Sequence, residues 1–239
     1  EACAEVHIPL IVLDRPNPNG HYIDGPVLQP AFKSFIGMHP VPVVYGMTIG
    51  EYAQMINGEK WLAKSVTTDL KVISLANYTH QTPYSLPVKP SPNLPNDASV
   101  NLYPSLCFFE GTNVSMGRGT NKQFQIYGAP YFDKTAFHFT PKPNVGDKSP
   151  KFNGKVCYGE DLSKTAPLSQ LNLMWLKKAF EQGKGVKTSF FTASFNKIAG
   201  NDLLKKQITE GKTEAEIRQS WQKDLDKFKE IRKKYLLYK

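Results

Sequence analysis

The run "PLIVLD", residues 9–14, is the stretch that decides the fold of this chain. A short and nearly continuous apolar run is typical of a strand that is covered on both faces, as strands of parallel sheets are. The strand ends on Asp14, at the position where open parallel sheets present polar groups. The sequence therefore predicts an α/β fold in which residues 9–14 form one strand of a parallel sheet.

The residues that follow supply the helix and the further strands of a parallel α/β fold. A second apolar run, "VPVVY" at 41–45, leads into "GMTIGEYAQMING" at 46–58. Thr48 and Glu51 match the Ser/Thr-x-x-Glu capping box, and apolar residues recur at helical spacing until Asn57-Gly58 ends the helix. The run "DLKVISLANY", residues 69–78, predicts a further strand. The order strand, helix, strand indicates a parallel sheet.

The chain changes character beyond residue 80, where prolines recur within a polar stretch and exclude regular structure. We expect three segments. Residues 1–80 form the C-terminal part of a Rossmann-like domain, residues 81–99 form a Pro-rich connection, and residues 100–239 form a C-terminal α+β domain. The fold predicted for the whole chain is thus part of a parallel sheet followed by a mixed domain.

The second domain is predicted to contain several strands, separated by Gly, Pro and Asn turns, and two helices. Its last helix begins at a second capping box, Thr213 and Glu216, and carries an apolar stripe to Tyr235. Residues 187–195 fit either a short strand or an extended loop. The strands are expected at 105–109, 123–132, 136–141 and 154–162, and the first helix at 168–182.

Composition limits the classes of function. The 30 Lys and Arg residues outnumber the 21 Asp and Glu residues, and the net charge of +9 favours anionic partners without choosing among nucleic acid, lipid head groups and acidic glycans. Mixed charges on the last helix are more typical of a solvated face, so we expect no nucleic-acid partner. No apolar run is long enough to span a membrane. The three cysteines and five histidines have no metal-ligand spacing, so no metal and no cofactor is predicted.

Polar residues gather in a loop after the first strand, where α/β proteins build sites. Asp14 has the chemistry of a general acid or base, and Arg15 that of a bidentate clamp for a carboxylate. Asn17 and Asn19 complete this set of predicted site residues. An equal alternative is structural, in which Asp14 and Asn17 organise a turn while Arg15 pairs with a nearby aspartate.

A second polar set lies in "LYPSLCFFEGTNVSMGRGTNKQF", residues 102–124. Glu110 follows an apolar run, and in such a context burial raises the pKa of a carboxyl group. Thr112 and Asn113 come next, and Arg118 lies between two glycines that leave room for a ligand. No phosphate-binding glycine motif is present. The alternative is a structured turn in which Glu110 and Arg118 pair with each other.

Seven stretches of the chain resemble, in order, the exo-β-N-acetylmuramidase (NamZ-type) glycoside hydrolases of bacteria. They are "PLIVLDRPNPNG", "DGPVLQPAFKSFIGMHPVPVVYGMTIGEYAQMIN", "PSPNLPN", "LYPSLCFFEGTNVSMGRGT", "FTPKPN", "KVCYGEDL" and "FKEIRKKYLLY". The resemblance covers essentially the whole chain. It implies a periplasmic or secreted enzyme of peptidoglycan turnover that releases terminal N-acetylmuramic acid from the non-reducing end of glycan or muropeptide fragments.

The same resemblance implies that the catalytic acids lie upstream of Glu1, in motifs that this chain lacks, so the catalytic residues of the chain are unknown and the chain resembles a fragment. Asp14, Arg15, Asn17, Asn19, Glu110, Thr112, Asn113 and Arg118 are then expected to bind substrate. Arg118 is the expected partner of the lactyl carboxylate. A glycan-binding module without catalytic activity is the alternative function.

Overall fold

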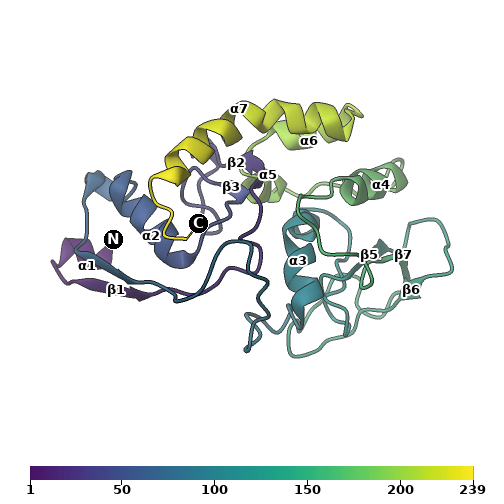
Figure 1. Ribbon diagram of the computed structural model, residues 1–239. Helices are drawn as coiled ribbons and strands as arrows, with labels where there is room; N and C mark the ends of the chain where they lie inside the picture. Colours follow the sequence, from purple (N-terminus) through teal and green to yellow (C-terminus); the bar gives the residue numbers. More distant parts are fainter. Residues whose placement is uncertain (239) are drawn as a thin grey trace.

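The computed structural model describes residues 1–238 of the chain (Figure 1). Strand β1 (Leu10–Leu13) pairs in parallel with β4 (Leu70–Ile73), and helix α2 (Ile49–Gly58) packs on both. Short helix α1 (Ala2–Glu5) precedes β1. The predicted parallel sheet is therefore confirmed for β1 and β4. The run at 41–45, expected as the strand that leads into the helix of this sheet, pairs antiparallel with another strand instead. The capping box is confirmed, with the Thr48 hydroxyl accepting from the backbone N–H of Glu51.

A second small sheet lies between these strands in the sequence. Strand β2 (Asp24–Val27) pairs antiparallel with β3 (Pro42–Val44), and two short 3-10 helices, η1 (Pro30–Phe32) and η2 (Ala63–Ser65), complete this part. The end of the loop expected after the first strand belongs to this sheet, because Asp24 and Val27 pair with Val44 and Pro42 across an irregular register. Pro26 fits there because the pairing is interrupted between the two partners.

The following part begins with a helix instead of the strand expected at 105–109. Helix α3 (Asp97–Leu106) starts at an Asn96 cap and runs directly into the 3-10 helix η3 (Cys107–Gly111). The apolar run there faces the interior along one side of these helices, so its hydrophobicity reflects burial and not a strand. The irregular connection consequently ends at Asn96, and residues 97–99 belong to α3.

Strand β5 (Ile126–Ala129), strand β7 (Cys157–Asp161) and strand β6 (His138–Phe139) form an antiparallel sheet in that order. They lie within the stretches predicted as strands. Helix α4 (Met174–Gln182) begins six residues later than predicted at 168, because the Leu171 N–H donates to Asp24 and holds the preceding segment extended. Within 187–195, Phe191 forms an isolated bridge with Thr112, and helix α5 (Phe195–Ala199) starts at the end of that stretch.

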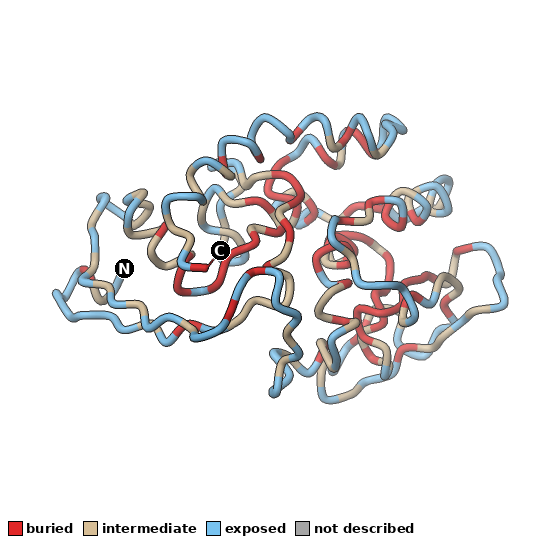
Figure 2. Tube along the Cα trace, in the orientation of Figure 1, coloured by how far each residue is buried: buried red, intermediate tan, exposed pale blue. Residues whose placement is uncertain are grey.

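Helix α6 (Leu203–Thr209) and the long helix α7 (Glu214–Lys233) lie above the rest of the molecule in Figure 1. Arg218 on α7 bonds Asp24 at 2.7 Å and also the Leu171 carbonyl, so α7 is fixed to β2. Buried residues are concentrated around α3, β5 and the adjoining helices, whereas the end that carries α1 and β1 is mostly exposed (Figure 2). No helix among residues 1–238 is long and apolar enough to cross a membrane. The mixed α/β class, the parallel sheet and the long C-terminal helix agree with prediction.

Candidate functional site

A cavity of about 560 Å³ lies between α2 and β3 on one side and α3, η3 and α5 on the other. Segments far apart in the sequence form its walls, so no single motif marks it. The side chains with polar or aromatic chemistry in these walls are Phe35, His39, Tyr45, Tyr52, Tyr103, Cys107, Glu110 and Lys197. Apolar residues supply most of the remaining surface, and the size and character of the cavity are those of a small-molecule site.

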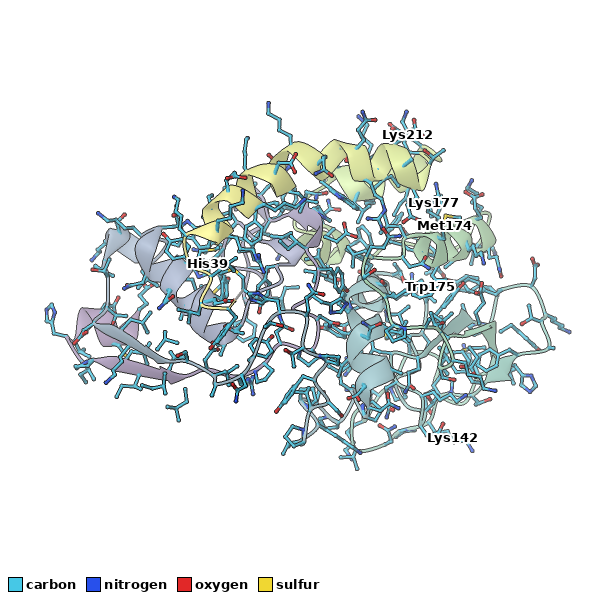
Figure 3. All side chains as sticks on the ribbon, in the orientation of Figure 1. His39, Lys142, Met174, Trp175, Lys177 and Lys212 are labelled. Atoms are coloured by element: carbon cyan, nitrogen blue, oxygen red, sulfur yellow. The ribbon has the colours of Figure 1, made fainter. Side chains whose placement is uncertain are left out.

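One wall is aromatic. The ring of Tyr45 stacks on Tyr52 with centroids 5.1 Å apart, and Tyr52 meets His39 edge-on at 6.0 Å. His39 in turn stacks nearly parallel on Trp61 at 5.5 Å. Helix α2 provides Tyr52, and Figure 3 shows His39 beside that helix. We call these four side chains the aromatic row.

The pKa values of the titratable side chains in the aromatic row keep them uncharged near neutral pH. Burial, with a smaller effect from Lys33, lowers the pKa of His39. Burial and then the neighbouring Tyr45 raise the pKa of Tyr52 to about 12, and burial raises the pKa of Tyr45 against a weaker opposite effect of Arg15. The wall therefore presents neutral ring faces and neutral phenol groups.

The opposite wall carries Glu110 on η3, the one predicted site residue that lines the cavity. Glu110 is the only carboxylate in the lining drawn from residues 1–238. Its neighbour Cys107 is a protonated thiol, because burial and then Glu110 raise the thiol pKa to about 12. The phenol of Tyr103, whose pKa is raised chiefly by burial, lies on the same wall. This wall can donate and accept hydrogen bonds but contains no thiolate nucleophile.

Lys151 fixes the backbone that carries Glu110. Its ammonium group donates to the carbonyl oxygens of Phe109, Glu110 and Thr112 at 3.1, 3.3 and 2.5 Å. Burial lowers the pKa of Lys151 to about 8, with Glu110 acting in the opposite direction and Arg118 in the same one. The Phe109 carbonyl also accepts from the N–H and the hydroxyl of Thr112, so Lys151 adds a further contact there and supplies the donor for the Glu110 carbonyl. Lys151 thereby fixes the end of η3 and the position of Glu110.

Asp14 lies in a buried polar network away from the cavity lining. Its carboxylate accepts from the Thr48 hydroxyl at 2.7 Å, the Gly50 N–H at 2.8 Å and the Tyr238 hydroxyl at 2.6 Å. Glu51 accepts from the backbone N–H groups of Leu237 and Tyr238 and lies 2.8 Å from His80. The two carboxylates thus bind the end of the chain to the start of α2.

The two asparagines of the first loop also contact the protein's own backbone. Asn17 donates to the Met47 carbonyl at 2.8 Å and accepts from the Asn19 N–H at 2.9 Å. Asn19 donates to the Val100 carbonyl at 2.9 Å and accepts from the Asn101 amide. These contacts join the first loop to α3. Neither side chain lines the cavity.

Thr112 and Asn113 hold the segment after η3 in place. The buried Thr112 hydroxyl donates to the Phe109 carbonyl at 2.9 Å and accepts from the Val114 N–H at 3.2 Å. Asn113 donates two hydrogen bonds to the neighbouring segment, from its side-chain amide to the Ser189 carbonyl and from its backbone N–H to the Phe190 carbonyl. The structure therefore brings neither residue into the cavity lining.

The two predicted arginines differ in their surroundings. Arg118 forms an ion pair with Asp147, with Nε 3.0 Å from the carboxylate, so the alternative in which it pairs with Glu110 is wrong. The exposed Arg15 guanidinium has no hydrogen bond or ion pair with any residue of 1–238. The alternative in which Arg15 pairs with an aspartate is therefore also wrong, and Arg15 is available to an anionic group.

Gly117 and Gly119, which flank Arg118, serve the loop itself. Both have positive φ, and a side chain at either would collide with the carbonyl of Lys122 or Lys142. The glycines consequently permit close packing within the protein. Their positions leave no opening at the backbone for a ligand.

The sequence does not distinguish Tyr52 of the aromatic row, because it fits the apolar spacing of α2. Tyr52 is in fact half-buried, with its ring on the cavity side. His39, Tyr45 and Trp61 lie on three other segments, which meet only in the folded chain. Phe, Trp and Tyr occur in residues 39–61 at about the same frequency as the 12% of the whole chain, so the sequence carries no signal for this wall.

The fold and the cavity define a mixed α/β protein with an aromatic-walled site that contains a single carboxylate. Two family models match the chain: "Exo-beta-N-acetylmuramidase NamZ, N-terminal" over residues 1–98 and "Exo-beta-N-acetylmuramidase NamZ, C-terminal" over residues 101–238. The chain belongs to the exo-β-N-acetylmuramidase NamZ family. This finding confirms the resemblance noted in the sequence.

The chain is 36% identical over 258 aligned residues to the peptidoglycan β-N-acetylmuramidase NamZ of Bacillus subtilis (strain 168). The match covers 100% of this chain and 61% of that relative, so the chain spans less than two thirds of its length. A crystal structure of a DUF1343 family protein from Bacteroides fragilis NCTC 9343 superposes with a TM-score of 0.95 at 46% identity, covering 100% of this chain and 68% of the other. A second such protein from that organism, with a TM-score of 0.82 at 24% identity over the same shares, has the same fold.

Proposed function

We propose that this chain is part of an exo-β-N-acetylmuramidase that degrades peptidoglycan by releasing terminal N-acetylmuramic acid from the non-reducing end of glycan or muropeptide fragments. The observation that carries the proposal is the match of both family models, which together account for nearly all of the chain. The cavity supports it, because a site of about 560 Å³ with an aromatic wall and an opposite carboxylate suits a sugar ring.

The chemistry of glycoside hydrolysis explains why the chain is proposed as one part of the catalyst. Hydrolysis needs an acid that protonates the leaving oxygen and a second group that attacks or stabilises the oxocarbenium-like centre. The cavity supplies one carboxylate, Glu110, and no second one within the described residues. The acetamido oxygen of the substrate can itself serve as the nucleophile. The acids expected upstream of Glu1 would complete the site, with Glu110 as an acceptor for sugar hydroxyl groups.

An anionic sugar also needs a cation. N-acetylmuramic acid carries a lactyl carboxylate, and the predicted site residues include two arginines that could bind it, Arg15 and Arg118. Arg118 is already paired with Asp147, whereas Arg15 has no partner among the described residues. We therefore assign the lactyl carboxylate to Arg15 in preference to Arg118.

The test compares this chain with a longer protein of the family type that carries the upstream acids. Both are incubated with a chromogenic β-N-acetylmuramide, and release of the chromophore is followed. We expect turnover by the longer protein and none by the 239-residue chain. Equal turnover by both would contradict the assignment of the catalytic acids to the upstream part, and no turnover by either would reject the hydrolase.

The arginine assignment is tested in the longer protein. Arg15→Ala is expected to raise KM for the muramide about tenfold with little change in kcat, because the lost contact serves binding in the ground and transition states alike. Arg118→Ala is the matched control, since its charge is already neutralised by Asp147. A collapse of kcat with unchanged KM in Arg15→Ala would assign that residue to the chemical step.

A second candidate function is a glycan-binding module without hydrolytic activity. The single carboxylate of the cavity favours it, because two carboxyl groups are usual in glycosidases. Calorimetry with muropeptides separates the two candidates. Tight binding without hydrolysis, in the longer protein as well as in this chain, would identify the module.

The proposed substrate implies a periplasmic or secreted location, because peptidoglycan lies outside the cytoplasmic membrane. Fractionation of the cells that produce the protein, followed by immunodetection, tests this point. Recovery in the cytoplasmic fraction alone would contradict it.

A further inference from the structure

The aromatic row has a chemistry that the proposed hydrolysis does not use. We propose that the cavity faces of Tyr45, Tyr52 and His39 form a subsite for an uncharged pyranose of the N-acetylhexosamine class, and that Trp61 positions His39 within it. The inference rests on the proposed function in one respect, because it takes the ligand to be a peptidoglycan sugar. It adds that the row holds the neutral sugar of the glycan and not the muramyl residue.

The arrangement of the rings is the first argument. Tyr45, Tyr52 and His39 follow one another at 5.1 and 6.0 Å and all line the same cavity. Tyr45 and Trp61 of the row pack on the small buried cluster that includes Met47 and Met55. The cavity side of the row remains open, and there the C–H faces of a pyranose can lie against the rings.

The phenol groups are the second argument, and they point to a ligand with hydroxyl groups. Tyr45, Tyr52 and Tyr103 all line the cavity, and their hydroxyls form no hydrogen bond with any residue of 1–238. None of the three is a buried hydroxyl without a partner, so all three are accessible to a ligand. A sugar placed between the row and α3 would supply donors and acceptors to all three, which a purely apolar ligand could not.

The charges of the cavity are the third argument, and they favour a neutral sugar. Glu110 and Lys197 are the carboxylate and the ammonium group in its lining, and Arg15 and Lys33 act on Tyr45 and His39 from outside the lining. A lactyl carboxylate held against the row would face Glu110 across the cavity, and like charges at close range repel. Arg15, the cation assigned to that carboxylate, does not line the cavity.

The turn at residues 34–37 adds apolar side chains beside the aromatic row. The backbones of Ser34 and Gly37 bridge each other in a tight turn that places Phe35 at its tip. The Phe35 side chain is 98% exposed and still lines the cavity, as does the half-exposed Met38. This turn leads directly into His39, so it offers apolar contact to a second ring of a glycan chain.

Fluorescence of Trp61 gives a direct test on the 239-residue chain. The other two tryptophans, Trp175 and Trp221, are only 6% and 5% exposed, so a ligand in the cavity reports through the half-buried Trp61. Tri-N-acetylchitotriose, a neutral glycan, is titrated while tryptophan emission and, independently, the heat of binding are recorded. We expect saturable binding and a shift of the emission, which Trp61→Phe abolishes while affinity stays within a few fold.

Substitutions in the row provide the decisive comparison. Tyr52→Ala is expected to lower affinity for the neutral glycan about tenfold, because a stacking face is removed, and Tyr52→Phe to lower it by a few fold. Tyr84→Ala is the matched control, since Tyr84 is half-buried and does not line the cavity. Circular dichroism checks that each variant folds. If Tyr52→Ala does not fold, Tyr45→Leu replaces it.

The outcomes separate this inference from the proposed function. Absence of saturable binding, or equal affinity of the wild type and the Tyr52 or Tyr45 variant, would overturn the subsite. Binding of N-acetylmuramic acid at the row without binding of the neutral glycan would overturn it while leaving the hydrolase intact. If the wild type binds the neutral glycan, the Tyr52 and Tyr84 variants show the expected affinities and the longer protein hydrolyses nothing, the subsite is supported and the hydrolase is rejected.

Discussion

Strands β1 and β5 are both short apolar strands, yet their surroundings differ completely. All four residues of β5 are buried, and its Tyr127 lies in the main hydrophobic cluster. Along β1 no residue is buried, and Leu13 is 73% exposed. Figure 2 shows the contrast, with buried residues around β5 and exposed ones along β1. The prediction that β1 is covered on both faces is therefore wrong within the described chain.

The comparison shows what hydrophobicity in a sequence specifies. An apolar run identifies a strand, but its stabilisation depends on the area that the rest of the fold removes from water. β5 pairs with β7, and its Tyr127 stacks on Phe109 of η3 within the main hydrophobic cluster. Among the described residues, β1 pairs only with β4 and contacts α2. A sheet of two strands has little stability of its own. The sheet region of the chain thus depends on α2 and on the polar network around Asp14.

The largest expected effect tests this contrast directly. Phe109 is fully buried and stacks on Tyr127 with centroids 5.0 Å apart. Phe109→Ala should lower the free energy of unfolding by about 3–5 kcal/mol, because it leaves a cavity in the core. Leu13→Ala should change it by less than about 0.5 kcal/mol, since that side chain is already in water. Urea unfolding measures both. A loss of several kcal/mol at Leu13 would show that its face is covered in solution.

The sequence was sufficient for elements whose signals are local. The capping box and apolar spacing of α2, the strands β1 and β4 of a parallel sheet and the stripe of α7 were all predicted and found. Helix α3 was missed because Pro104 lies within it and aromatic residues follow it, two features that favour a break and a strand. The packing of this helix over the main cluster outweighs the one backbone hydrogen bond that Pro104 cannot make.

The candidate site was less accessible to prediction, because its walls come from distant segments. Glu110 was identified from the polar residues that follow it, and it lines the cavity. Asp14, Asn17 and Thr112 had the same polar character, but each contacts backbone or side-chain partners of the protein itself. Nothing in residue type distinguishes a carboxylate that caps a buried helix from one that faces a ligand. That difference depends on tertiary contacts.

A second prediction concerns Lys151 and pH. The folded pKa of about 8 lies below the usual 10.5, so between these values the unfolded chain binds more protons than the folded one. Stability contributed by this group therefore rises with pH, by up to about 1.4 kcal/mol per pH unit. The free energy of unfolding of the wild type relative to Lys151→Met should rise accordingly between about pH 8 and about pH 10.

Chemical denaturation at several pH values checks the Lys151 prediction. The tyrosines that ionise in the same range are common to both proteins, so their effect cancels in the difference. Lys71→Met is the matched control, because Lys71 is exposed on β4, and its difference from the wild type should stay constant. If the difference for Lys151→Met is constant or falls with pH, the Lys151 ammonium group is solvated and is not buried against the end of η3.

The smallest expected effect compares two capping boxes of the same sequence pattern. The Thr48 hydroxyl accepts from the Glu51 N–H and also donates to the buried Asp14 carboxylate at 2.7 Å, whereas the Thr213 hydroxyl bonds only to Glu216 at an exposed helix end. Thr213→Ala should cost about 1 kcal/mol, the ordinary value of a cap. Thr48→Ala should cost about 2–3 kcal/mol, because a buried carboxylate also loses a donor. Equal losses in urea unfolding would mean that water replaces the Thr48 hydroxyl at Asp14, and Thr48→Ser, which retains the hydroxyl, should recover most of the loss.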